Sequence, residues 1–133
     1  MFIGLESSLL ASGSALFGEL GTVAPLDDPR CDACIVRATV QVGPEFLRRH
    51  PALKYVATAS SGFDHMDLRA LDSHGVRSYV ARGCNAEAVA DWVELALRAV
   101  NTTPGRLGIV GVGHAGSAVA RRFAGPVMLC DPP

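Results

Sequence analysis

The sequence predicts an α/β fold with a mostly parallel sheet. Short apolar runs alternate with segments of helical periodicity along the 133 residues, and strands that alternate with helices form parallel sheets. The composition is 49% hydrophobic and 19% charged, which is enough apolar material to bury a core.

Each expected element begins or ends at a recognisable residue. Pro44 opens a short helix that ends before Pro51, Gly75 follows the last turn of another helix, and Asn85 is placed to cap a long amphipathic helix. The expected helices are 9–20, 44–50, 67–74, 86–100 and 115–124. The expected strands are 2–5, 22–24, 33–37, 53–59, 76–80, 107–111 and 127–131.

Residues 111–116, Gly-Val-Gly-His-Ala-Gly, form a G-x-G-x-x-G motif in the context that dinucleotide binding requires. An apolar strand enters the motif and an amphipathic helix leaves it. The next strand ends in Asp131, 20 positions after Gly111. Together these features make up the dinucleotide fingerprint.

The chemistry of nucleotide binding gives each residue of the motif a role. Gly111 permits the tight turn, Gly113 lets the backbone approach a pyrophosphate, and Gly116 lets helix and strand pack closely. Asp131 can accept the ribose hydroxyls and would repel a 2′-phosphate, which favours NAD over NADP. A flavin, another adenosine cofactor, or a glycine-rich turn without ligand are the alternatives. The expected cofactor contacts are Gly111, Gly113, His114, Ala115, Gly116 and Asp131.

Cys31 and Cys34 form a C-x-x-C pair that leads into a strand, whereas redox motifs of this kind open a helix. No second pair completes a zinc site, so we interpret them as two small semi-buried residues. We expect reduced thiols and, because Met1–Leu20 has no basic n-region, a cytoplasmic protein.

Charged residues elsewhere suggest structural roles. Asp67 is placed to cap the helix that follows it, and we interpret His65 as a structural histidine rather than a metal ligand. Glu94 and Arg98 are spaced to form a solvated ion pair. The net charge of −1 and the absence of a basic run argue against nucleic-acid binding. No apolar stretch approaches the ~20 residues that span a bilayer.

The pattern divides into residues 1–84 as a small α/β lobe, 85–106 as a crossover helix and linker, and 107–133 as the start of a dinucleotide-binding domain. Two strands and one helix cannot build an independent core. We therefore expect residues 107–133 to pack on the first lobe, on another chain, or on sequence outside this one. We interpret the chain as the front part of a longer protein, and we expect this chain to self-associate when it is isolated.

Three stretches resemble the D-2-hydroxyacid dehydrogenases, in the order of that family: Ile35–Thr39, Tyr55–Asp67 and Asn85–Asp91. Gly83–Ala86 and Leu129–Pro133 are similar to the branch that oxidises a phosphorylated 2-hydroxy acid with NAD. The resemblance implies a flavodoxin-like substrate lobe, followed by the first βαβ unit of a Rossmann domain.

The resemblance also implies substrate contacts on two loops of the first lobe. Ala38 stands where the family usually has serine, which removes a polar contact, whereas Ser60 replaces a threonine and keeps the hydroxyl. The implied substrate residues are Ala38, Ser60, Ser61 and Gly62. Phe63 replaces a usual threonine, and His114 replaces a usual asparagine.

The family's catalytic Arg, Glu and His follow the second strand of the NAD domain, so the resemblance places them beyond Pro133. No catalytic residue is therefore assigned, and we expect this chain alone to be an inactive part of a dehydrogenase. The alternative is a non-catalytic nucleotide-binding or interaction module.

Overall fold

The computed structural model describes residues 1–100 and 105–131 and divides the chain into two compact units, Met1–Ala81 and Arg82–Pro133. Part of the expected linker, residues 101–104, and the final two prolines lie outside the described residues. The long helix α4 (Ala86–Ala99) belongs to the second unit.

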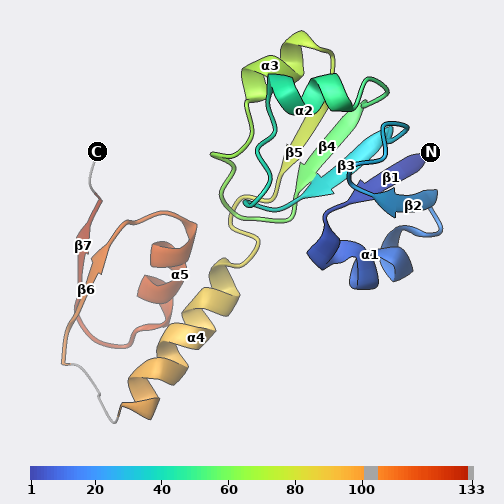
Figure 1. Cartoon of the computed structure of the whole chain (residues 1–133). Coiled ribbons are helices and arrows are strands. Elements are labelled where there is room, and N and C mark those ends of the chain that lie inside the picture. Colours follow the sequence, from blue (N-terminus) through green and yellow to red (C-terminus); the bar gives the residue numbers. More distant parts are fainter. Residues whose placement is uncertain (101–104, 132–133) are drawn as a thin grey trace. The chain divides into compact units, whose positions relative to one another are not determined.

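The first unit is built on a five-stranded parallel sheet with the order β2-β1-β3-β4-β5. This is the flavodoxin-like order, so the expected fold class is confirmed. Helix α1 lies on one face of the sheet, and α2 and α3 lie on the other (Figure 1). The strands are β1 Phe2–Leu5, β2 Thr22–Pro25, β3 Ala33–Val36, β4 Tyr55–Thr58 and β5 Arg77–Val80. The helices are α1 Leu10–Phe17, α2 Pro44–Arg49 and α3 Leu68–Ser73.

Cys31 and Cys34 lie in the core of this unit and are more deeply buried than the sequence suggested. A Cβ at Gly4 would come within 2.8 Å of the Cys31 sulfur and 3.3 Å of the Cys34 sulfur, so only glycine fits there without movement. Burial raises the pKa of Cys34 to about 12. Both thiols are free and buried, as expected of packing residues and not of a reactive pair.

Two of the predicted helix-end residues, Asp67 and Gly75, are confirmed, and a third, Asn85, is not. Asp67 caps α3 by accepting the backbone N–H of Ala70 at 2.9 Å, and Gly75 takes the left-handed conformation after it, with φ of 69°. The predicted side-chain cap at Asn85 is wrong. The main chain closes that turn instead, because the N–H of Ala86 donates to the carbonyl of Gly83 at 3.0 Å.

The first helix is shorter than residues 9–20. A 3₁₀ turn over Ser7–Leu9 precedes α1, and α1 ends at Phe17. The chain must then reverse direction to enter β2, which pairs in parallel with β1 from Thr22 onward. The turn between them therefore takes the residues that the periodicity assigned to the helix.

The second unit consists of α4 and a βαβ motif. Strands β6 (Leu107–Val110) and β7 (Val127–Cys130) are parallel, and α5 (His114–Arg122) connects them. Three small buried residues, Ala86, Ala90 and Ala118, let α4 and α5 approach closely. Helix α4 thus supplies the apolar partner that α5 requires. Among the described residues, no helix is long and apolar enough to cross a membrane.

Candidate functional site

The glycine motif forms the turn between β6 and α5. Gly111 follows the last residue of β6 and has φ of 92°, a left-handed conformation that favours glycine. Gly113 is the N-cap residue of α5, and a Cβ there would meet no atom within 4 Å. The backbone at Gly113 is therefore open to close approach by a ligand, and the N–H groups of His114 and Ala115 begin the helix.

Gly116 holds the helix against the strand. A Cβ at this position would lie 2.0 Å from the carbonyl oxygen of Gly111 and 3.2 Å from Cγ2 of Ile109. Real Cβ atoms do not come that close to backbone oxygen. Only glycine therefore allows α5 to pack at this distance from β6, as the motif predicted.

Asp131 is joined directly to the turn. The backbone N–H of Val112 donates to its Oδ1 at 2.8 Å. The ends of β6 and β7 are thus linked by a side chain as well as by the ladder bond from Gly111 N–H to the Cys130 carbonyl at 2.8 Å. The exposed carboxylate keeps its second oxygen available as an acceptor.

A cavity of about 500 Å³ opens at this turn. Of the predicted cofactor residues, Gly113 and His114 line it. The other four do not: Gly111, Ala115, Gly116 and Asp131. Glu87 and Arg121 also line the cavity, from α4 and α5, and the motif did not identify them. The available signal was helical spacing, since His114, Ser117 and Arg121 recur at the i, i+3 and i+7 positions of one face.

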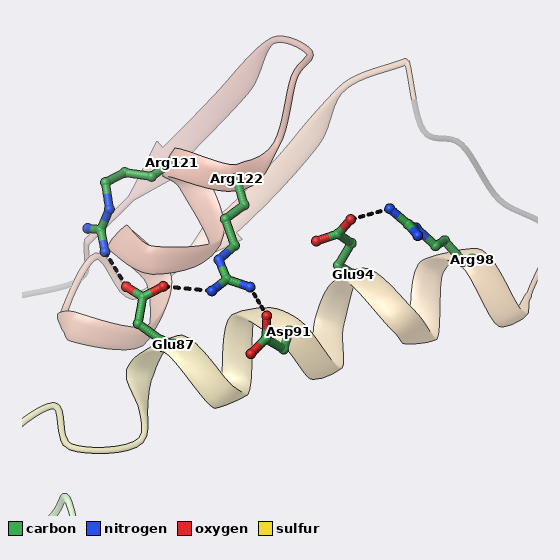
Figure 2. Close-up of polar contacts among 6 residues, drawn as sticks. All are labelled: Glu87, Asp91, Glu94, Arg98, Arg121 and Arg122. Atoms are coloured by element: carbon green, nitrogen blue, oxygen red, sulfur yellow. Dashed lines mark hydrogen bonds and ion pairs between the residues drawn. The ribbon is translucent and has the colours of Figure 1, made fainter.

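An ion-pair network joins α4 to α5 beside this cavity (Figure 2). Glu87 pairs with Arg121 at 2.7 Å and with Arg122 at 2.8 Å, and Arg122 also pairs with Asp91. The Arg122 and Arg121 guanidiniums hold the pKa of Glu87 below its usual 4.5. By contrast, the predicted pair of Glu94 and Arg98 is present but lies within α4 alone.

The predicted substrate residues lie in the first unit, on the loops that follow β3 and β4. The backbone N–H of Ala38 donates to Oγ of Ser60 at 3.1 Å, so the structure brings these two residues together. Ser61 and Gly62 continue the same loop. Parallel strands end at one edge of a sheet, which is where α/β folds bind ligands.

No group of three or more His, Cys, Asp or Glu side chains in the described part of the chain is arranged to hold a metal ion. His50 and His65 are buried, and each makes hydrogen bonds within the first unit. The partners of their ring nitrogens are protein carbonyl and hydroxyl oxygens.

A family description, D-isomer specific 2-hydroxyacid dehydrogenase, catalytic domain, matches residues 22–123. The chain belongs to this family. The match includes the loops of the first unit, the glycine turn and the whole of α5, and it ends before Asp131. The resemblance found in the sequence is therefore confirmed.

Curated relatives share the family and a common name. An erythronate-4-phosphate dehydrogenase from Pseudoalteromonas atlantica is 36% identical over 141 residues, which cover 99% of this chain and 36% of the relative. The enzyme of the same name from Proteus mirabilis is 38% identical over 120 residues, covering 84% of this chain and 31% of the relative. The chain thus spans about a third of the length of these relatives.

Solved structures support the fold. A Thermus thermophilus protein superposes with a TM-score of 0.79 at 24% identity, covering 100% of this chain and 57% of the other. The NAD⁺-bound 3-phosphoglycerate dehydrogenase of Entamoeba histolytica superposes with a TM-score of 0.70 at 18% identity. The superposition covers 99% of this chain and 54% of the other. At these identities the likeness concerns the fold alone.

Gly116→Ala and Gly113→Ala separate packing from ligand access. We expect Gly116→Ala to destabilise the second unit by about 1–3 kcal/mol, because its Cβ overlaps a backbone oxygen. Gly113→Ala should change stability by less than about 0.5 kcal/mol, because its Cβ enters open space. Thermal unfolding followed by the fluorescence of Trp92, the only tryptophan, measures both. Equal destabilisation by the two variants would contradict this account of the turn.

Glu87→Gln should weaken the docking of α4 on α5, with Glu94→Gln as the matched control within one helix. Since the folded-state pKa of Glu87 is lowered, its contribution is complete above about pH 4.5 and is lost as the pH falls through the folded pKa. We expect Glu87→Gln to lower the midpoint temperature of thermal unfolding at pH 7 more than Glu94→Gln does. The difference in midpoint between Glu87→Gln and wild type should shrink below pH 4.5. Equal shifts for both variants at pH 7 would refute the link.

Proposed function

We propose that this chain supplies the substrate lobe and the first nucleotide-binding unit of an NAD-dependent dehydrogenase that oxidises 4-phosphoerythronate. That reaction lies on the way to pyridoxal phosphate. The observation that carries the proposal is the identity of 36–38% to erythronate-4-phosphate dehydrogenases. The open backbone at Gly113, with Asp131 joined to the same turn, supports the choice of a dinucleotide.

The residues of the turn fit NAD by their chemistry. Open backbone at Gly113 and the first N–H groups of α5 suit a pyrophosphate. The carboxylate of Asp131 keeps acceptor sites for two ribose hydroxyls while Oδ1 holds Val112, and its charge disfavours a 2′-phosphate. When bound, the nicotinamide would accept hydride from the carbon that carries the substrate hydroxyl.

The substrate loops offer donors to an anionic hydroxy acid. Oγ of Ser60 accepts the N–H of Ala38, which orients the hydroxyl and leaves its own hydrogen to donate. A carboxylate or phosphate oxygen is a suitable acceptor. In this proposal Ser60, Ser61 and Gly62 surround one end of the substrate, and Ala38 contributes backbone only. The four free thiols suit a reducing compartment, so we place the protein in the cytoplasm.

Asp131→Asn tests the cofactor assignment more cleanly than alanine does. The asparagine oxygen can still accept the Val112 N–H, so the turn keeps its anchor while the charge is removed. We expect NAD binding to weaken by about 1.5–3 kcal/mol through loss of charge-assisted bonds, and the gap to NADP to narrow. Titration calorimetry with both nucleotides measures this. An unchanged preference between NAD and NADP would count against the assignment.

We expect the isolated 133-residue chain to show no turnover. The family's acid–base residues have no assigned counterpart in it, and proton removal from the hydroxyl requires a positioned base. Incubation with NAD and 4-phosphoerythronate, followed at the NADH absorbance, should not exceed buffer. Activity that co-purifies with the chain would overturn the expectation.

We also expect the isolated chain to self-associate. Val110 and Met128, on β6 and β7, are 79% and 60% exposed, and in the described residues these strands pair only with each other. Unpaired strand edges beside apolar surface are templates for another chain. Light scattering during size-exclusion chromatography measures the mass. A monodisperse monomer at tens of micromolar would contradict this expectation.

A further inference from the structure

A buried histidine and a buried threonine meet beneath the substrate loops. His65 is 6% exposed and lies in the connection from β4 to α3, and Thr58 is 3% exposed and ends β4. Nε2 of His65 is 3.1 Å from Oγ1 of Thr58. Buried polar groups are costly unless they are paired, so each of these side chains fixes the other in position.

A chain of hydrogen bonds runs from this pair to the predicted substrate residues. Oγ1 of Thr58 accepts the backbone N–H of Ser60 at 3.2 Å. Oγ of Ser60 in turn accepts the N–H of Ala38 at 3.1 Å. The position of the Ser60 hydroxyl is therefore set by two contacts: Thr58 holds the backbone of Ser60, and the N–H of Ala38, in the loop after β3, holds its Oγ.

The backbone of His65 joins the same two loops a second time. Its carbonyl accepts the N–H of Val42 at 2.8 Å, and the Val42 carbonyl accepts the N–H of Asp67 at 2.8 Å. Val42 and Met66 form a parallel bridge between the loops, and both are buried. The ring of His65 thus fixes the end of β4 while its main chain fixes the loop after β3.

We infer that His65 is a positioning residue: through Thr58 it sets the geometry in which Ser60, whose Oγ accepts the N–H of Ala38, presents its hydroxyl to an anionic 2-hydroxy acid. The inference rests on the proposed function for its ligand, but the hydrogen-bond chain stands on the structure of the first unit. The imidazole touches no substrate in this arrangement and acts only through the hydroxyl of Thr58. Ala38 contributes only its backbone N–H to this arrangement.

Amide hydrogen exchange of the ¹⁵N-labelled full chain tests the hydrogen-bond chain without any ligand. His65→Phe removes the ring nitrogens, Thr58→Val removes the hydroxyl at nearly constant shape, and His65→Gln offers an amide at a similar reach. His74→Phe is the matched control, because His74 is an exposed histidine at the end of α3. Val56, in the middle of β4, is the internal reference for stability of the whole unit.

We expect the exchange of Ser60 and Ala38 to accelerate relative to Val56 in both His65→Phe and Thr58→Val. The acceleration should reach about tenfold at Ser60 in Thr58→Val, where the Ser60 N–H loses its acceptor. His65→Gln should recover most of the protection, and His74→Phe should match wild type. Unchanged exchange at Ser60 and Ala38 would overturn the inference. Equal acceleration at Val56 would do the same, since it would show a general loss of stability. Thr58→Val keeps the test decisive if His65→Phe fails to fold.

Titration with 4-phosphoerythronate separates the inference from the proposed function. Wild type should show shifts of the Ala38 and Ser60 amides, and His65→Phe should raise the Kd by about tenfold, whereas His74→Phe leaves it unchanged. If the variants show the exchange difference but wild type shows no shifts with the ligand, the proposed substrate is contradicted and the hydrogen-bond chain is supported. Equal Kd values for wild type and His65→Phe overturn the positioning role.

Discussion

The close approach of α5 to β6 is the constraint on which the second unit depends. With hydrogen in place of a side chain at Gly116, the first turn of the helix can lie against the carbonyl of Gly111. That position leaves Gly113 facing open space and brings Val112 within reach of Asp131. The close packing at Gly116, the open backbone at Gly113 and the bond from Val112 to Asp131 thus occur together in one short turn.

In the first unit, hydrogen bonds rather than a glycine contact hold the candidate binding loops in place. Its loops after β3 and β4 are tied by Ala38 to Ser60 and by Val42 to His65. The buried contact of His65 with Thr58 lies beneath both ties. Loops at the end of a sheet bind ligands well when a rigid scaffold fixes them. Here hydrogen bonds between the two loops fix them in addition to the sheet.

Local signals explain which features could be predicted from the sequence. Apolar runs identified the strands, and Asp67, Gly75 and the glycine motif act through neighbours within a few positions. The cap expected at Asn85 depends on how the preceding turn folds, and there Gly83 is left-handed and its carbonyl accepts the N–H of Ala86. The ion pairs of Glu87 with Arg121 and Arg122 span 34 and 35 positions, so no local spacing could indicate them. Likewise, His65 was recognised as structural, but its contact with Thr58 depends on how the loop folds back.

Chemical-shift mapping of NAD on the ¹⁵N-labelled chain tests the central claim, that the turn at Gly113 binds a dinucleotide. The account predicts saturable shifts at the amides of Gly113, His114 and Ala115, and at Asp131, with none along α1. This pattern follows from an open turn whose first helical N–H groups receive the pyrophosphate. Shifts confined to the first unit, or no saturable shifts at the turn, would contradict it.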